Sequence, residues 1–83
     1  MNLKLFGEFI KELREEKKLN QRELAEELHV DRTTVNKWEK GKSIPLNDTL
    51  MILSEYFEVT IEELLDTQNP FIIEMIRNDN VFY

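Results

Sequence analysis

Apolar residues recur at helical spacing through most of this 83-residue chain. Near the N-terminus the apolar side chains lie three or four positions apart, at Phe6, Phe9, Ile10 and Leu13. This spacing places them on one face of an amphipathic helix, with charged residues on the other face. No run with the alternating period of a strand occurs before residue 70. The pattern predicts an all-α fold with helices near 3–18, 21–28, 32–40, 47–57 and 61–66.

Three of these helices begin with recognisable start signals. Before 21–28, Asn20 is a suitable N-cap and Glu23 completes a capping box, while Leu19 and Leu24 form a hydrophobic staple. Similar signals precede the next helix at Asp31 with Val30 and Val35, and the last at Thr60 and Glu63 with Val59 and Leu64. We therefore expect helices to begin just after Asn20, Asp31 and Thr60.

The helices at 21–28 and 32–40 are both short and are joined by a tight turn. His29 falls in that turn, and histidine is among the residues that tolerate a left-handed backbone. Gly41 supplies the left-handed residue that ends the second helix. Two short helices joined in this way form the supersecondary unit that reads DNA. The arrangement favours sequence-specific DNA binding.

Length and composition point to one small domain in a reducing compartment. At 83 residues the chain can bury about 60–65% of its extended surface, enough for a single core. It has no cysteine, which excludes disulfides and thiolate metal sites and fits the cytoplasm. Its apolar runs are too short to span a bilayer, and its N-terminus lacks the pattern of a secretory signal. We expect a cytoplasmic protein that does not enter a membrane.

The residue types argue against an enzyme or a cofactor site. The carboxylates cluster on the polar helix faces, where they solubilise the chain, and no nucleophile, base and orienting group can be assembled around the single histidine, His29. That histidine has no second histidine or cysteine with which to bind a metal. Two glycines are too few for a phosphate-binding loop. We expect no enzymatic activity, no cofactor and no metal.

The charge of this chain is unevenly distributed. Its formal net charge is −6, which is unusual for a protein that binds nucleic acid. The segments 1–30, 31–45 and 46–83 carry net charges of −1, +2 and −7, so the predicted second helix of the pair and its exit are basic. Exposed charges more than about 10 Å away are largely screened by salt. The local basic segment therefore remains compatible with contact to phosphates.

The chain changes character after residue 66. The segment 67–70, TQNP, breaks the helical pattern, and the residues beyond it are too apolar for a solvated terminus. We divide the chain into a DNA-binding domain at 1–66 and a C-terminal extension at 67–83 that forms a helix or an arm. The extension either packs on the domain or contacts a second copy through Phe71, Ile72, Met75, Ile76, Phe82 and Tyr83.

Residues 6–66 resemble the DNA-binding domains of the lambda and 434 repressors and Cro, members of the xenobiotic-response-element family of regulators. The resemblance is carried by Arg14, LNQRELAEEL (19–28), VDRTTVNKWEKG (30–41), Pro45, Leu50 and the pair Leu64–Leu65. It implies a five-helix bundle whose third helix enters the major groove. The residues expected to contact bases there are Arg32, Thr33, Thr34 and Lys37.

Their chemistry supports this assignment. Arginine and lysine donate to guanine, and threonine can contact the methyl group of thymine. The resemblance also implies phosphate contacts around that helix, and the candidates are Gln21, Asn36, Lys40, Lys42 and Ser43. It further implies a structural ion pair between Arg14 and Glu39. The helical period places Val35 and Trp38 in the core.

The resemblance predicts a transcriptional regulator, with repression as the expected sign. It would bind a pseudo-palindromic operator on double-stranded DNA as a homodimer. The chain offers no room for a ligand-sensing domain, so we expect no small-molecule ligand. The alternative is a protein-interaction module, such as an antitoxin or anti-repressor, whose acidic C-terminal half binds a protein partner.

Overall fold

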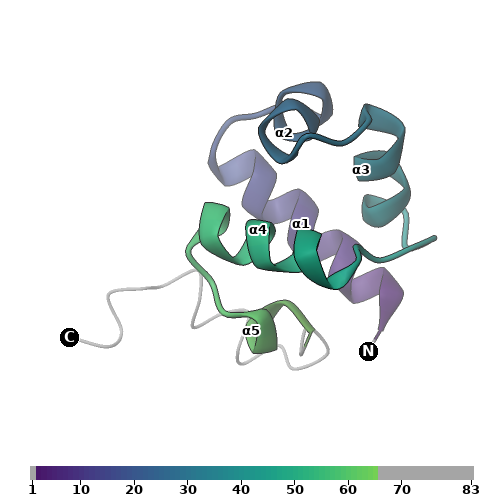
Figure 1. Ribbon diagram of the computed structural model, residues 1–83. Coiled ribbons are helices and arrows are strands. Elements are labelled where there is room, and N and C mark those ends of the chain that lie inside the picture. Colours follow the sequence, from purple (N-terminus) through teal and green to yellow (C-terminus); the bar gives the residue numbers. More distant parts are fainter. Residues whose placement is uncertain (1, 66–83) are drawn as a thin grey trace.

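The computed structural model describes residues 2–65 and shows five helices packed around one core (Figure 1). They are α1 (Leu3–Glu16), α2 (Gln21–Leu28), α3 (Arg32–Glu39), α4 (Asn47–Phe57) and α5 (Ile61–Leu65). No strand occurs among these described residues. The all-α prediction is confirmed, and α2 and α4 have the predicted bounds.

The first helix ends earlier than the apolar pattern predicts. We expected it to reach Lys18, but α1 ends at Glu16 and Lys18 has a φ of 59°. A left-handed residue cannot continue a right-handed helix. The chain therefore turns at Lys18 and brings α2 back across the end of α1.

Apolar side chains from all five helices form the core. Phe6, Phe9 and Ile10 of α1 are almost fully buried, as are Val35 and Trp38 of α3. The other buried apolar side chains are Leu13, Leu24, Ala25, Leu28, Leu50, Leu53, Phe57, Val59 and Leu64. Figure 1 shows α2 and α3 on one side of α1, with α4 crossing in front of α1 and α5 below. The inward positions of Val35 and Trp38 agree with the prediction.

A glycine allows α1 to approach the end of α3 closely. A Cβ atom added to Gly7 would lie 2.3 Å from the carbonyl oxygen of Trp38 and 2.7 Å from that of Glu39. Such distances are shorter than van der Waals contact and involve backbone atoms, which cannot rotate away. Gly7 therefore lets the last turn of α3 pack directly on the backbone of α1.

The predicted capping signals are correct for two helices and wrong in one respect for the third. At α2, the side chain of Asn20 accepts a hydrogen bond from the backbone N–H of Glu23 at 2.8 Å, and the carboxylate of Glu23 accepts one from the backbone N–H of Asn20 at 2.8 Å. Thr60 and Glu63 make the same reciprocal pair at α5. Asp31 occupies the N-cap position of α3, but its side chain makes no capping hydrogen bond. The start of α3 therefore lacks the closure that we expected.

The turn between α2 and α3 has the predicted conformation. His29 is left-handed, with φ at 57° and ψ at 43°, and Gly41 after α3 has a φ of 71°. Glu58 after α4 is also left-handed, which the sequence did not indicate. The left-handed residues His29, Gly41 and Glu58 let the chain change direction within short loops.

The C-terminal extension predicted at 67–83 lies outside the described residues. The boundary at residue 66 and the proposed contacts of Phe71, Ile72, Met75, Ile76, Phe82 and Tyr83 therefore remain predictions. Across residues 2–65, no helix is long and apolar enough to cross a bilayer.

Candidate nucleic-acid interface

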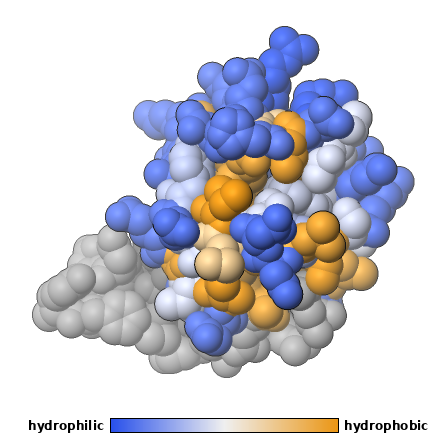
Figure 2. Space-filling model, viewed as in Figure 1, coloured by the Kyte–Doolittle hydropathy of each residue, from blue (hydrophilic) through white to orange (hydrophobic). Residues whose placement is uncertain are grey.

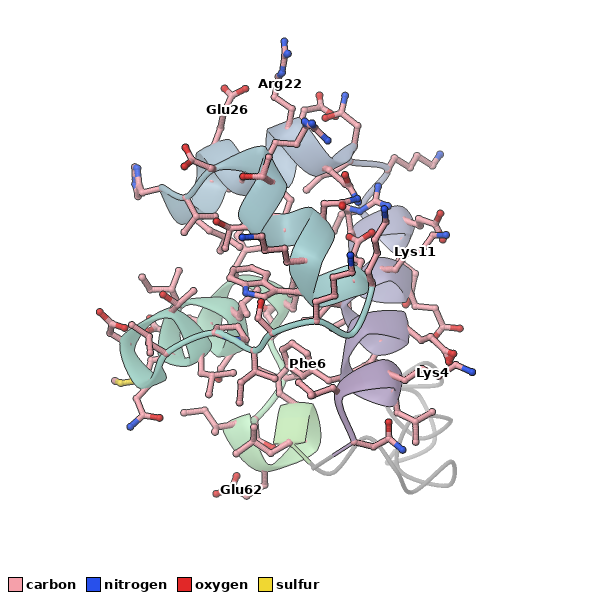
Figure 3. All side chains as sticks on the ribbon, turned by 90° about the vertical axis from the view of Figure 1, so that its right-hand side faces the viewer. Lys4, Phe6, Lys11, Arg22, Glu26 and Glu62 are labelled. Atoms are coloured by element: carbon pink, nitrogen blue, oxygen red, sulfur yellow. The ribbon has the colours of Figure 1, made fainter. Side chains whose placement is uncertain are left out.

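The third helix lies on the outside of the bundle, where one side of it is free of other helices (Figure 3). Its inner side carries Val35 and Trp38, whose exposed fractions are 0% and 2%. Its outer side carries Arg32, Thr33 and Lys37, which are exposed. The burial of two side chains at helical spacing determines which of the remaining residues face solvent. The helix α3 is thus packed on the core by its inner side and exposes polar side chains on its outer side.

Apart from Gln21, the other predicted contact residues lie on this helix or directly after it. Thr34, Asn36 and Ser43 are half-buried, and Lys40 and Lys42 are exposed. Gln21 is half-buried at the first position of α2. Their contact with DNA stays a prediction.

The ion pair implied by the resemblance is present and joins α1 to the end of α3. Arg14 donates from Nε to one carboxylate oxygen of Glu39 at 2.6 Å and from Nη2 to the other at 3.1 Å. The two side chains are 11% and 5% exposed. Hydrogen bonding to Glu39 raises the pKa of Arg14, although burial opposes this effect. Arg14 also donates to the carbonyl oxygen of Leu19 at 2.7 Å, which holds the loop between α1 and α2.

The hydrogen-bonded group extends further than the sequence suggested. The Nε2 of Gln21 donates to Oε1 of Glu39 at 3.0 Å, and the Nδ2 of Asn36 donates to Oε1 of Gln21 at 3.3 Å. Two residues that we predicted as phosphate contacts therefore bind each other in the free protein. No local sequence pattern predicts this link, because it depends on how α2 and α3 cross.

A shallow recess of about 380 Å³ lies beside α3, between that helix, the loop at 42–46 and the start of α4. Its polar lining brings Thr34 and Lys37 together with Ser43 and adds Thr49, a hydroxyl that the sequence analysis did not single out. The remaining lining residues are Val30, Trp38, Ile44, Pro45 and Leu46. Three of the predicted contact residues thus share one surface.

Acidic side chains on α2 affect the pKa of Tyr56 on α4. Burial raises the pKa of Tyr56, and the charges of Glu27 and Glu23 raise it further. The Nζ atom of Lys17 lies 5.0 Å from the centroid of the same ring, in a cation–π contact. Glu23 and Glu27 thus act on a residue of α4, while the exposed side chains of Arg32 and Lys37 on α3 are basic.

Among the described residues, no group of three or more His, Asp or Glu side chains could hold a metal ion. The predicted contact residues instead carry amide, hydroxyl, ammonium and guanidinium groups on α2, on α3 and in the loop after α3. This chemistry suits hydrogen bonding to bases and phosphates.

Sequence comparisons relate the chain to known regulators. A model of the helix-turn-helix family matches residues 10–64. The chain is 41% identical to the HTH-type transcriptional activator BcrR of Enterococcus faecalis over 75 residues, 90% of this chain and 36% of BcrR. It is 32% identical to the cryptic phage CTXphi transcriptional repressor RstR of Vibrio cholerae over 74 residues, 89% of this chain and 67% of RstR. The chain thus spans about a third of one relative and two thirds of the other.

Solved structures show the same fold. The restriction-modification controller protein C.AhdI from Aeromonas hydrophila superimposes with a TM-score of 0.67 and 31% identity, over 75% of this chain and 94% of that protein. The DNA-binding domain of the P22 C2 repressor gives a TM-score of 0.68 and 29% identity, over 78% of this chain and 86% of the domain. The clp gene regulator ClgR from Corynebacterium glutamicum, at 16% identity, supports the fold alone, with a TM-score of 0.72 over 98% of this chain and 86% of ClgR.

Proposed function

This chain belongs to the helix-turn-helix family, and from that membership we propose that it regulates transcription by binding a specific DNA sequence. The observation that supports the proposal best is the division of α3 into two sides. Val35 and Trp38 are buried, while Arg32 and Lys37 are exposed on a helix that the Arg14–Glu39 pair holds in place. A helix presented in this way fits the major groove.

Base recognition would fall to the exposed start and middle of α3. Arg32 and Lys37 can donate to the O6 and N7 of guanine, and Thr33 and Thr34 can contact a thymine methyl group. Each good contact of this kind discriminates by about 1–3 kcal/mol against the wrong base. The charges of Lys40 and Lys42 and the hydroxyl of Ser43 would bind the phosphates that flank the groove.

We further propose that the protein binds as a homodimer to half-sites separated by about one helical turn, ~34 Å. Exposed apolar side chains on and beside α4 support an interface with a second copy (Figure 2). Leu46 is 78% exposed and Met51 55%, which is high for large apolar residues in a small domain. The apolar residues of the extension, from Phe71 to Tyr83, are the second part of the proposed interface.

Repression is the sign of regulation that we propose. Of the two relatives, the repressor RstR matches over 67% of its length and the activator BcrR over 36%. Occupying an operator is sufficient to block transcription and requires no further domain. Because such a regulator must reach the DNA, we propose that it acts in the cytoplasm.

Selection of bound oligonucleotides from a random pool, followed by a salt titration, tests the proposal. We expect one enriched sequence with two-fold symmetry and an affinity at least 1,000-fold above that for random DNA, the lower end for specific regulators. The logarithm of the binding constant should fall linearly with the logarithm of salt concentration, by about 0.9 per phosphate neutralised. A pool that shows no enrichment after repeated rounds would overturn the proposed function.

A further inference from the structure

Four side chains form one continuous set of hydrogen bonds from α1 to the middle of α3. Arg14 donates to both carboxylate oxygens of Glu39, Gln21 donates to Glu39, and Asn36 donates to Gln21. Gln21 is therefore a bridge, with its amide nitrogen on the ion pair and its amide oxygen on α3. The set spans three helices and ends on the helix that carries Arg32 and Lys37.

The carboxylate at the root of this set determines the direction of every bond. A carboxylate only accepts hydrogen bonds, whereas an amide has one end that donates and one that accepts. Because Glu39 accepts, Gln21 must turn its Nε2 toward Glu39 and its Oε1 toward Asn36. Asn36 must in turn present Nδ2 to Gln21. The orientation of an amide, often ambiguous, follows here from the charge of Glu39.

From this geometry we propose that Gln21 and Asn36 act as one positioning unit, through which Glu39 orients α3 for base recognition. The inference depends on the DNA-binding function proposed above. It gives both residues a role that the sequence did not suggest, besides the predicted contact with phosphates.

The need for such a unit follows from the way α3 is held. Its last turn is fixed by Glu39 and by close packing on Gly7, but at its start the side chain of Asp31 makes no capping hydrogen bond. The bond between Asn36 and Gln21 links α2 to α3 one turn before Glu39. It therefore restrains rotation of α3 about its fixed end, which would move Arg32 relative to the bases.

A double-mutant cycle on DNA affinity tests the proposal. Gln21→Ala and Asn36→Ala should each lower affinity for the selected operator by about 2- to 10-fold, the range expected for one hydrogen bond. Because both changes break the same link, the double variant should bind about as well as either single variant. Affinity for random DNA should fall less than affinity for the operator, since the orientation of α3 matters most for contacts with bases.

A matched control uses an exposed residue of α3 outside the set. Thr33→Ala combined with Gln21→Ala should give the product of the two single effects, because no described hydrogen bond joins them. Multiplying effects for Gln21 and Asn36, or equal weakening on operator and random DNA, would overturn the positioning role.

A measurement on the free protein separates failure of this inference from failure of the DNA-binding proposal. Gln21→Met removes the amide and keeps the length of the side chain. The NMR signals of the Asn36 side-chain amide should then shift, whereas those of Asn47, an exposed residue at the start of α4, should not. If the Asn36 signals stay in place, the coupling is absent even if the parent protein binds an operator.

Discussion

The helices α2 and α3 have the same length, but side-chain hydrogen bonds hold the start of α2 and the end of α3. Each contains eight residues and follows an extended N-cap residue. At α2 the start is closed by two reciprocal hydrogen bonds between Asn20 and Glu23, but at α3 the Asp31 side chain makes none. The opposite end of α3 is the fixed one, through Glu39 and Trp38.

The difference suggests a division of labour between the two helices. α2 is bound to the scaffold from its first residue, so it can serve as the support. α3 is anchored by its last turn and by the buried Val35, while Arg32 and Thr33, at its start, are exposed. The start of α3 can therefore present exposed side chains to DNA.

The largest expected effect comes from releasing the fixed end of α3. Glu39→Ala leaves Arg14 largely buried without its carboxylate, which should lower the free energy of unfolding by about 3–5 kcal/mol. Urea denaturation followed by circular dichroism measures this loss. Glu26→Ala is the matched control, because Glu26 points outward from α2 (Figure 3) and a surface substitution should change stability by about 0.5 kcal/mol or less. Equal losses for both variants would show that α3 is not anchored by the ion pair.

Substitution of Gly41, which follows the C-cap residue of α3, should have a smaller effect on stability. Gly41 has a φ of 71°, and a Cβ atom there would lie 3.1 Å from the Cα of Lys4. Gly41→Ala should therefore cost about 1–2 kcal/mol through the left-handed backbone. His29→Gly, at the left-handed end of α2, should be neutral or stabilising by up to about 1 kcal/mol, because it relieves the same strain. Thermal denaturation of the two variants compares the helix ends, and a destabilised His29→Gly would contradict this account.

The smallest expected effect is the difference in stability cost between substitutions at the N-caps of α2 and α3. Asn20→Ala removes a capping bond and should cost about 1 kcal/mol. Asp31→Ala removes no such bond, so only the interaction of its charge with the helix dipole is lost, about 0.5 kcal/mol. Chemical denaturation of both variants under the same conditions gives the difference. A cost for Asp31→Ala equal to that for Asn20→Ala would mean that α3 is capped after all.

The sequence predicted the helices because apolar periodicity and capping chemistry are local properties. It placed His29 and Gly41 correctly, since glycine and histidine signal a left-handed residue. Lys18 and Glu58 carry no such signal, and their positive φ values follow from the packing of the helices on either side. The periodicity therefore could not show that α1 stops at Glu16.

The candidate site divides in the same way. The buried side of α3 follows from its period, and the Arg14–Glu39 pair followed from a resemblance. The link between Gln21 and Asn36 joins residues 15 positions apart, and it exists only because α2 and α3 cross at a particular angle. No local pattern encodes that angle, so this part of the site required the structure.

The affinity of α3 variants for the selected operator tests the central claim most directly. Arg32→Ala and Lys37→Ala should each weaken operator binding by about 5- to 150-fold, equivalent to 1–3 kcal/mol, with little change in stability. Lys11→Ala is the matched control, since it removes the same unit charge from an exposed side chain that belongs to α1 and not to α3 (Figure 3). We expect it to weaken operator and random DNA equally and by less. Operator affinities unchanged in both α3 variants would contradict the claim that this helix reads DNA.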